Sequence, residues 1–156
     1  MDDEYFMCIA LEEAEIALKE GNWPIGCVIV HENKIIAKAH NLTNTTKDEF
    51  NHAEMLALKL AQKTIAENPK EITLYTTFEP CPMCFGAILL HKIKRVVSGT
   101  NADKSGAMHI TEHLGKIFQQ DKYQVLHSSG ILANQCLDVF MKFPKAITLM
   151  SNGFIN

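Results

Sequence analysis

The chain has 156 residues, of which 47% are hydrophobic and 21% charged, which is the size and composition of one globular domain. No run approaches the roughly 18 uncharged apolar residues that a membrane span needs, so a membrane protein is excluded. With a net charge of −3, a single arginine (Arg95) and scattered lysines, the sequence does not favour a nucleic-acid-binding surface, although a basic patch could still assemble in three dimensions or across a dimer.

The number of cysteines bears on the cellular compartment. There are five, an odd number, and two of them have the spacing of metal ligands, which predicts a reducing cytoplasm and not a disulfide framework. The acidic first residues are the opposite of the basic start of a signal peptide. Cys8, Cys27 and Cys136 stand among apolar residues and are expected to be small buried side chains.

The first third of the chain predicts a helix and a β-hairpin. Apolar residues recur at helical spacing over residues 4–20, and a Gly-Asn pair follows. Two short apolar runs, 27–30 and 35–39, are separated by polar turn residues and predict paired strands. A polar loop over 43–50 then leads to the next helix.

The middle of the chain alternates helices with strands. A helix is expected from residue 51 or 52 to about 67, a strand over 72–76, a second helix to about 91 and a strand over 95–99. This order, after a hairpin, predicts a three-layer α/β/α domain with a mixed sheet, and we expect residues 1–156 to form this single domain.

The last third is less regular. A weak helix is predicted over 110–118, a strand near 123–126 and a final amphipathic helix after Gly130, whereas Pro144 argues against a long continuation.

A metal-binding pattern stands in Pro80-Cys81-Pro82-Met83-Cys84. Prolines are tolerated at the first turn of a helix, and cysteines three apart share a helix face, so both sulfurs can point at one ion. His52 can supply a third ligand, which gives an open zinc site with one position for water. A structural zinc with a fourth ligand or a redox cysteine pair are the alternatives; thiolate ligands favour zinc over other divalent metals.

Glu54 lies two residues beyond His52, so its carboxylate is placed at the edge of the metal and can move protons for a water there. The alternative is an ordinary carboxylate in the first turn of a helix. Backbone N–H groups near Ala53 and at the cysteine turn could hold the polar edge of a substrate.

The pattern H-x-E followed by P-C-x-x-C resembles the signature of the zinc-dependent nucleobase deaminases. Residues 24–28, His40-Asn41 and 103–107 further resemble the branch that contains bacterial tRNA adenosine deaminases, and the resemblance covers roughly residues 4–139. It implies a cytidine deaminase-like fold with a five-stranded sheet, one zinc ion per chain, Glu54 as the proton carrier, Asn41 as a contact to the base, and a homodimer.

The substrate is less constrained than the reaction. Residues 49–51 and Phe85 are bulkier than is typical of the tRNA branch, and the C-terminal helix lacks its basic residues. We therefore favour hydrolytic deamination of a free base or nucleoside such as guanine, adenine or cytosine, with deamination of adenosine in the tRNA anticodon as the alternative. A zinc-stabilised, non-catalytic subunit is a third hypothesis, against which the presence of Glu54 speaks.

Overall fold

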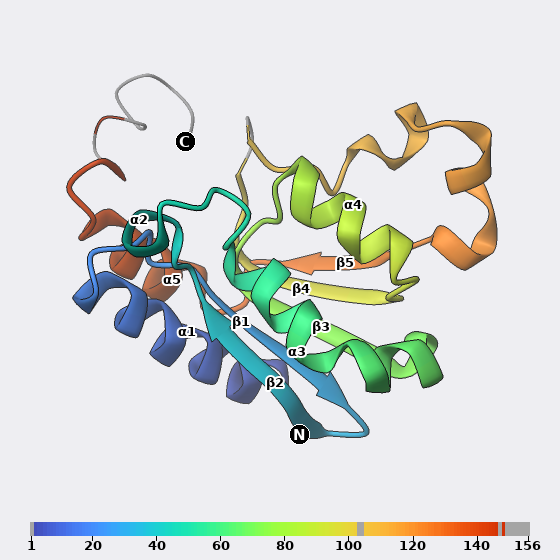
Figure 1. Cartoon of the computed structure of the whole chain (residues 1–156), viewed down its shortest axis with the longest axis horizontal. Helices are drawn as coiled ribbons and strands as arrows, with labels where there is room; N and C mark the ends of the chain where they lie inside the picture. Colours follow the sequence, from blue (N-terminus) through green and yellow to red (C-terminus); the bar gives the residue numbers. More distant parts are fainter. Residues whose placement is uncertain (1, 103–104, 147, 149–156) are drawn as a thin grey trace.

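A five-stranded sheet forms the centre of the molecule in the computed structural model, which describes residues 2–102, 105–146 and 148 (Figure 1). The strand order is β2-β1-β3-β4-β5; β1 is antiparallel to both β2 and β3, whereas β3, β4 and β5 run parallel. The predicted mixed sheet is therefore confirmed. The strands are β1 (Gly26–His31), β2 (Lys34–His40), β3 (Ile72–Phe78), β4 (Arg95–Thr100) and β5 (Leu126–Ser129).

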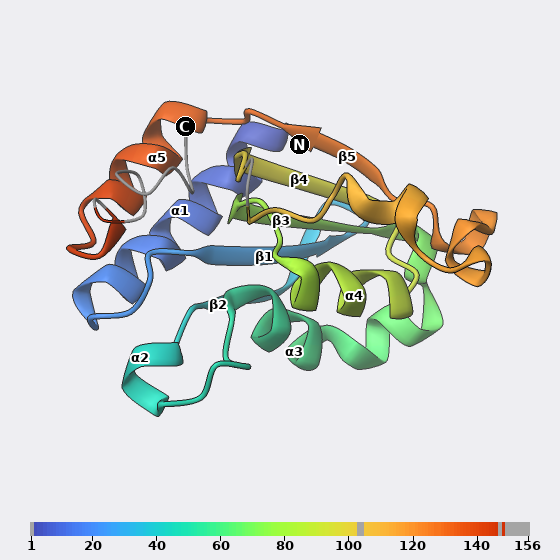
Figure 2. The ribbon, with the colours of Figure 1, turned by 90° about the horizontal axis from the view of Figure 1, so that it is seen from above.

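Helices cover both faces of this sheet, which confirms the three-layer arrangement. Figure 2 shows α1 and α5 on one face and α3 and α4 on the other. The α-helices are α1 (Asp3–Lys19), α2 (Thr43–Thr46), α3 (Ala53–Glu67), α4 (Pro82–Leu90) and α5 (Ala133–Met141). The 3-10 helices are η1 (Pro69–Glu71), η2 (Ile110–His113), η3 (Lys116–Gln119) and η4 (Asp121–Tyr123).

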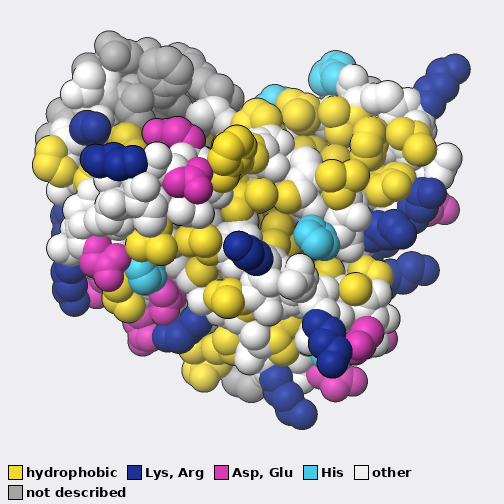
Figure 3. All heavy atoms as spheres, viewed as in Figure 1, with side chains coloured by type: hydrophobic (Ala, Val, Ile, Leu, Met, Phe, Trp, Pro, Cys, Tyr) yellow, Lys and Arg dark blue, Asp and Glu magenta, His cyan; other side chains and the backbone are white. Residues whose placement is uncertain are grey.

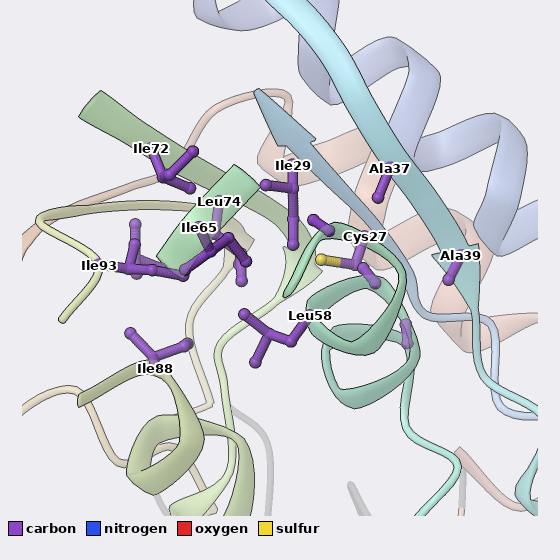
Figure 4. Packing of buried hydrophobic residues seen from close by; sticks show 14 residues of the cluster. Cys27, Ile29, Ala37, Ala39, Leu58, Ile65, Ile72, Leu74, Ile88 and Ile93 are labelled. Carbon is purple, nitrogen blue, oxygen red and sulfur yellow. The ribbon is translucent and has the colours of Figure 1, made fainter. Parts of the chain in front are cut away.

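The larger hydrophobic core lies between the sheet and the α3–α4 layer. Figure 4 shows Leu58 and Ile65 of α3 and Ile88 of α4 packed against Ile29 and Leu74 of the central strands. All five side chains are almost completely buried. Because α3 and α4 are both anchored by this core, their N-terminal ends are fixed relative to each other and to the sheet.

On the opposite face, Gly26 allows α1 to lie directly on β1. A Cβ atom at this position would come within 1.9 Å of the Ala10 carbonyl oxygen and within 2.7 Å of the Ala14 nitrogen. Both neighbours are backbone atoms and cannot rotate away. The close approach therefore depends on the missing side chain at the start of β1.

The structure corrects three expectations about the last third of the chain and the loops. The helix predicted over 110–118 is replaced by two 3-10 turns, because Gly115 between them is extended, with ψ of 148°. The strand expected near 123–126 starts only at Leu126, since η4 occupies the preceding residues. The loop expected over 43–50 contains the short helix α2.

A fourth correction concerns the thiols. Cys27 and Cys136 are buried as expected, but Cys8 is exposed, because it lies on the face of α1 that points away from the sheet. Asp103 and Lys104, part of the segment that resembles the tRNA branch, and residues 147 and 149–156 of the tail lie outside the described residues. Within the described part, no helix has the length and apolar character needed to cross a membrane.

Candidate active site

The metal-binding pattern is assembled where the N-terminal ends of α3 and α4 meet. His52 is the N-cap of α3, Cys81 is the N-cap of α4, and Cys84 lies in the first turn of α4. Pro82 occupies the first helical position of α4, where a missing N–H has no cost, and so fixes the start of the helix between the two cysteines. The structure therefore confirms the prediction that the N-terminal ends of these two helices converge.

The three side chains are close enough to hold one ion. His52 Nδ1 lies 3.6 Å from the sulfur of Cys81 and 3.5 Å from that of Cys84, and all three ligand atoms lie within 4.8 Å of one another. A nitrogen and a sulfur bound to one tetrahedral zinc at their usual bond lengths are separated by about 3.6 Å. One imidazole and two thiols at this spacing thus fit zinc, with a fourth position open.

The electrostatics of the cysteine pair suit a cation. A hydrogen bond from the Cys84 thiol, joined by one from His52, outweighs burial and lowers the pKa of Cys81 to about 4, so this sulfur is a thiolate at neutral pH. The contact with Cys81, together with burial, raises the pKa of Cys84. The two sulfurs share a proton that a bound cation would displace.

Glu54 lies in the first turn of α3. Among the described residues that line the site, it is the only buried carboxylate. Its side chain is 3% exposed, and burial raises its pKa above the ordinary value for glutamate. It lines the same cavity as His52 and Cys81. A buried carboxyl with a raised pKa beside a metal site is suited both to accept and to donate a proton.

A cavity of about 180 Å³ opens in front of these residues. Its walls come from both sides of the sheet edge and include polar, acidic and aromatic side chains. The lining residues are Trp23, Ile25, Asn41, Thr43, Glu49, His52, Glu54, Phe78, Glu79, Cys81, Ser105 and Phe140.

Asn41, predicted from the resemblance to contact the base, lines this cavity although it is 1% exposed. Its Oδ1 accepts hydrogen bonds from the backbone N–H and the hydroxyl of Thr43, at 3.1 and 2.9 Å. These bonds orient the side chain and leave its amide nitrogen as the donor for a ligand. Ala53 is buried as the first residue of α3, so its N–H has no acceptor within the helix.

Aromatic residues of the cavity were not identified from the sequence as a group. Phe78 and Phe140 are stacked with ring centroids 4.5 Å apart, and Trp23 stacks on Phe140 at 5.7 Å. Phe140 comes from α5, far along the chain, so no local pattern could place it here. Phe85, the bulky residue after the second cysteine, is 1% exposed and packs in the core with Leu89 and Ala107.

Glu79 is a further residue that the sequence prediction missed. Its two carboxylate oxygens accept hydrogen bonds from the backbone N–H groups of Ala102 and Met108, at 2.9 and 3.2 Å. A side chain on Gly106 would collide with this carboxylate. Glu79, which directly precedes the Pro80-Cys81 turn, thus holds the segment after β4 beside the cavity.

Fold and site together define the class of protein: a zinc-dependent deaminase, an enzyme that hydrolyses a carbon–nitrogen bond with an activated water. Residues 1–100 match the family model for the cytidine and deoxycytidylate deaminase zinc-binding region. The chain belongs to this family. The resemblance inferred from the His-x-Glu and Pro-Cys-x-x-Cys motifs, and the expected zinc ion, are thereby confirmed.

Comparison with individual proteins narrows the position within the family. The chain is 39% identical over 137 residues to a tRNA-specific adenosine deaminase of Bacillus subtilis, covering 86% of this chain and 83% of that protein. It is 30% identical, with a TM-score of 0.71, to a structure from a study of A-to-I editing by tRNA:A34 deaminases, covering 86% of this chain and 98% of that one. A guanine deaminase from Nitrosomonas europaea shares the fold, with a TM-score of 0.68 at 22% identity.

Proposed function

We propose that this protein is a tRNA adenosine deaminase, which converts adenosine to inosine in an anticodon. The supporting observation is the similarity to the Bacillus subtilis enzyme along most of both chains, combined with an intact set of zinc and proton-transfer residues. Deamination of a free base or nucleoside, which we favoured from the sequence, becomes the second candidate. The bulky side chains of residues 49–51 are weaker evidence about the substrate than the similarity along most of the chain.

In this proposal His52, Cys81 and Cys84 hold the zinc ion, one per chain. When bound there, zinc supplies Lewis-acid activation of a water molecule. The thiolate of Cys81 and the imidazole of His52 are already in place to receive the cation. Because these ligands come from two helix ends anchored in one core, little rearrangement is needed on binding.

Glu54 carries the protons. It accepts one proton from the attacking water and delivers it to the ring nitrogen. It then accepts the second proton of that water, from the hydroxyl now on the ring carbon, and delivers it to the exocyclic amine, which leaves as ammonia. The water oxygen becomes the oxo group of inosine, so atoms and charge balance. The raised pKa of the buried carboxyl suits a group that must be deprotonated before attack and protonated afterwards.

The cavity walls position the base. Asn41 offers its amide nitrogen as a hydrogen-bond donor to the base. The N–H of Ala53, the first residue of α3, has no acceptor within the helix and is a second donor beside His52. The aromatic rings of Trp23, Phe78 and Phe140 provide flat apolar surface, and stacking on such rings is tolerant of the base involved.

The second candidate, deamination of a free base or nucleoside, is favoured by the charge of the cavity. Three carboxylates line it, those of Glu49, Glu54 and Glu79, and within the described part of the chain no lysine or arginine does so. Such an acidic lining does not attract the negatively charged phosphate groups that flank a base in tRNA.

Ammonia release from an anticodon stem-loop, compared with adenosine, guanine and cytosine, separates the candidates. We expect turnover of the stem-loop with a steep decrease at rising salt concentration, because phosphate contacts are lost by counterion competition. Turnover of a free base or nucleoside alone would establish the second candidate. If no substrate is deaminated by the zinc-loaded protein, the non-catalytic hypothesis replaces both.

We further propose that the protein forms a homodimer through α4 and acts in the cytoplasm. The sequence of α4, PMCFGAILL, has no charged side chain, and Leu90 at its end is 67% exposed. Figure 3 shows apolar side chains gathered over this helix. A helix that is apolar on every side is normally covered, and a second copy would cover it. The five free thiols fit a reducing compartment.

A further inference from the structure

His40, the last residue of β2, lies between two carboxylates of α1 and its C-cap. Its Nδ1 is 2.8 Å from Oε2 of Glu13, and its Nε2 is 3.2 Å from Oε2 of Glu20. Each glutamate oxygen can accept a hydrogen bond from a ring nitrogen that carries a proton, so His40 can join either or both glutamates to the end of β2. Lys38 Nζ lies 2.9 Å from the other oxygen of Glu13.

This cluster of His40, Glu13, Glu20 and Lys38 is partly shielded from solvent. Glu13 is 5% exposed, and although burial opposes its ionisation, hydrogen bonds from His40 and Lys38 prevail and lower its pKa. The other charged groups nearby are Glu12, which acts on Lys38, and Lys59 of α3, which lines a second cavity together with Glu13, Lys38 and His40.

The cluster stands where two cavity-lining segments begin. The chain leaves Glu20 into residues 21–25 and leaves His40 into residues 41–45, and both segments contribute side chains to the cavity. We refer to these two segments together as the cavity wall. The contact between His40 and Glu20 therefore joins the two segments at the residues from which they start.

Hydrogen bonds continue this connection along the cavity wall. The Asn41 N–H donates to the Ile25 carbonyl at 3.0 Å, and the Asn44 side chain donates to the Gly21 carbonyl at 2.9 Å. A shift between the C-terminus of α1 and the end of β2 would consequently move both segments and the side chains that they contribute to the cavity.

We propose that His40 is a positioning residue for the substrate: by joining Glu13 and Glu20 to the end of β2, it holds the cavity wall, and with it Asn41 and Trp23, in place. This inference rests on the proposed function in taking the cavity as the substrate site. It predicts that disrupting the cluster weakens substrate binding and leaves the chemical step, which depends on Glu54, largely intact.

The first test is kinetic and uses two glutamates of the same helical region. Glu20→Ala should raise KM roughly three- to fivefold with little change in kcat, as expected for losing a partly exposed ion pair. Glu15→Ala removes an equal charge from an exposed position and should match wild type. Glu20→Gln keeps an oxygen that accepts from Nε2 and should restore most of the binding.

The second test needs no activity, because Trp23 is the only tryptophan of the chain. His40→Asn should change the Trp23 emission in the zinc-loaded protein at constant pH, because the cavity wall that carries Trp23 loses the contact with Glu20. His109→Asn, at an exposed position, should leave the emission as in wild type.

Equal KM values for Glu20→Ala and Glu15→Ala would overturn the proposal, as would a wild-type Trp23 emission in His40→Asn. A parallel loss of kcat and of melting temperature in Glu20→Ala would mean that the cluster only stabilises the fold. If the wild-type protein deaminates nothing, the proposed function fails on its own, and the Trp23 emission of His40→Asn still decides whether His40 controls the cavity wall.

Discussion

His52 and Cys84 are 32 positions apart in the sequence, yet Nδ1 of one lies 3.5 Å from Sγ of the other across two helix ends. This separation fits shared ligation of one ion, so Cys84→Ala should lose most of its bound zinc and all measurable turnover. Cys8→Ala, which removes an exposed thiol, should retain both. Metal analysis after gel filtration measures the difference; a fully zinc-loaded Cys84→Ala protein would contradict the assignment.

Glu54→Gln preserves the shape of the side chain and removes its ability to exchange protons. We expect zinc content and melting temperature close to those of wild type, and kcat lower by at least about 100-fold, the usual contribution of a general acid–base group. Turnover measured by ammonia release tests this. A loss smaller than about tenfold would show that another group carries the protons.

The metal site could be predicted from the sequence because its determinants are local. Cysteines three apart with a proline between them, and a histidine two residues before a glutamate, define helix starts and ligand types on their own. The alternation of strands and helices further predicts that the N-terminal ends of the two helices meet at one edge of the sheet. The alternation also sufficed to predict the three layers and the mixed sheet.

The cavity could not be predicted in the same way, because its walls come from segments joined only by the fold. Phe140 stacks on Phe78 from a helix some 60 residues later, and Glu79 turns its carboxylate to backbone N–H groups that no side-chain pattern reveals. The spacing of apolar residues over 110–126 is short and ambiguous, so it predicts a helix over 110–118 and a strand near 123–126 where the chain forms 3-10 turns and a strand that starts at Leu126.

Arg95 binds Asp3 through two parallel hydrogen bonds, with nitrogen–oxygen distances of 2.6 and 2.9 Å, and thereby ties α1 to β4. The Arg95 hydrogen bonds, against partial burial and aided by Tyr75, keep the pKa of Asp3 below its ordinary value. A lowered pKa stabilises the fold above the unfolded-state value, and this contribution disappears as pH falls through the folded-state pKa.

Asp3→Asn should therefore destabilise the protein by about 1 kcal/mol at neutral pH and by progressively less in acid. Urea unfolding at several pH values measures this difference. Glu4→Gln, the neighbouring exposed carboxylate on α1, should show little effect at any pH. A constant difference between wild type and Asp3→Asn across the acid range would mean that ionisation of Asp3 does not contribute.

Gly26→Ala tests the close contact between α1 and β1. The added methyl group would overlap the Ala10 carbonyl, so α1 must shift, at a cost of about 1–3 kcal/mol in unfolding free energy. Gly115→Ala has no atom within 4 Å of the new Cβ and should be neutral or slightly stabilising. Thermal unfolding of both variants provides the measurement, and equal melting temperatures would refute the contact.

The uncharged surface of α4 predicts the oligomeric state. Leu90 lies at the end of α4 and is 67% exposed, so Leu90→Glu would place a carboxylate in the proposed interface without entering the core of the protomer. Burying an unpaired charge costs several kcal/mol, and we expect this variant to sediment as a monomer while wild type sediments as a dimer. Ile16→Glu, on an exposed position of α1, should leave the dimer intact. If wild type is monomeric at all concentrations, or if Leu90→Glu still dimerises, the apolar face of α4 is not the interface between copies.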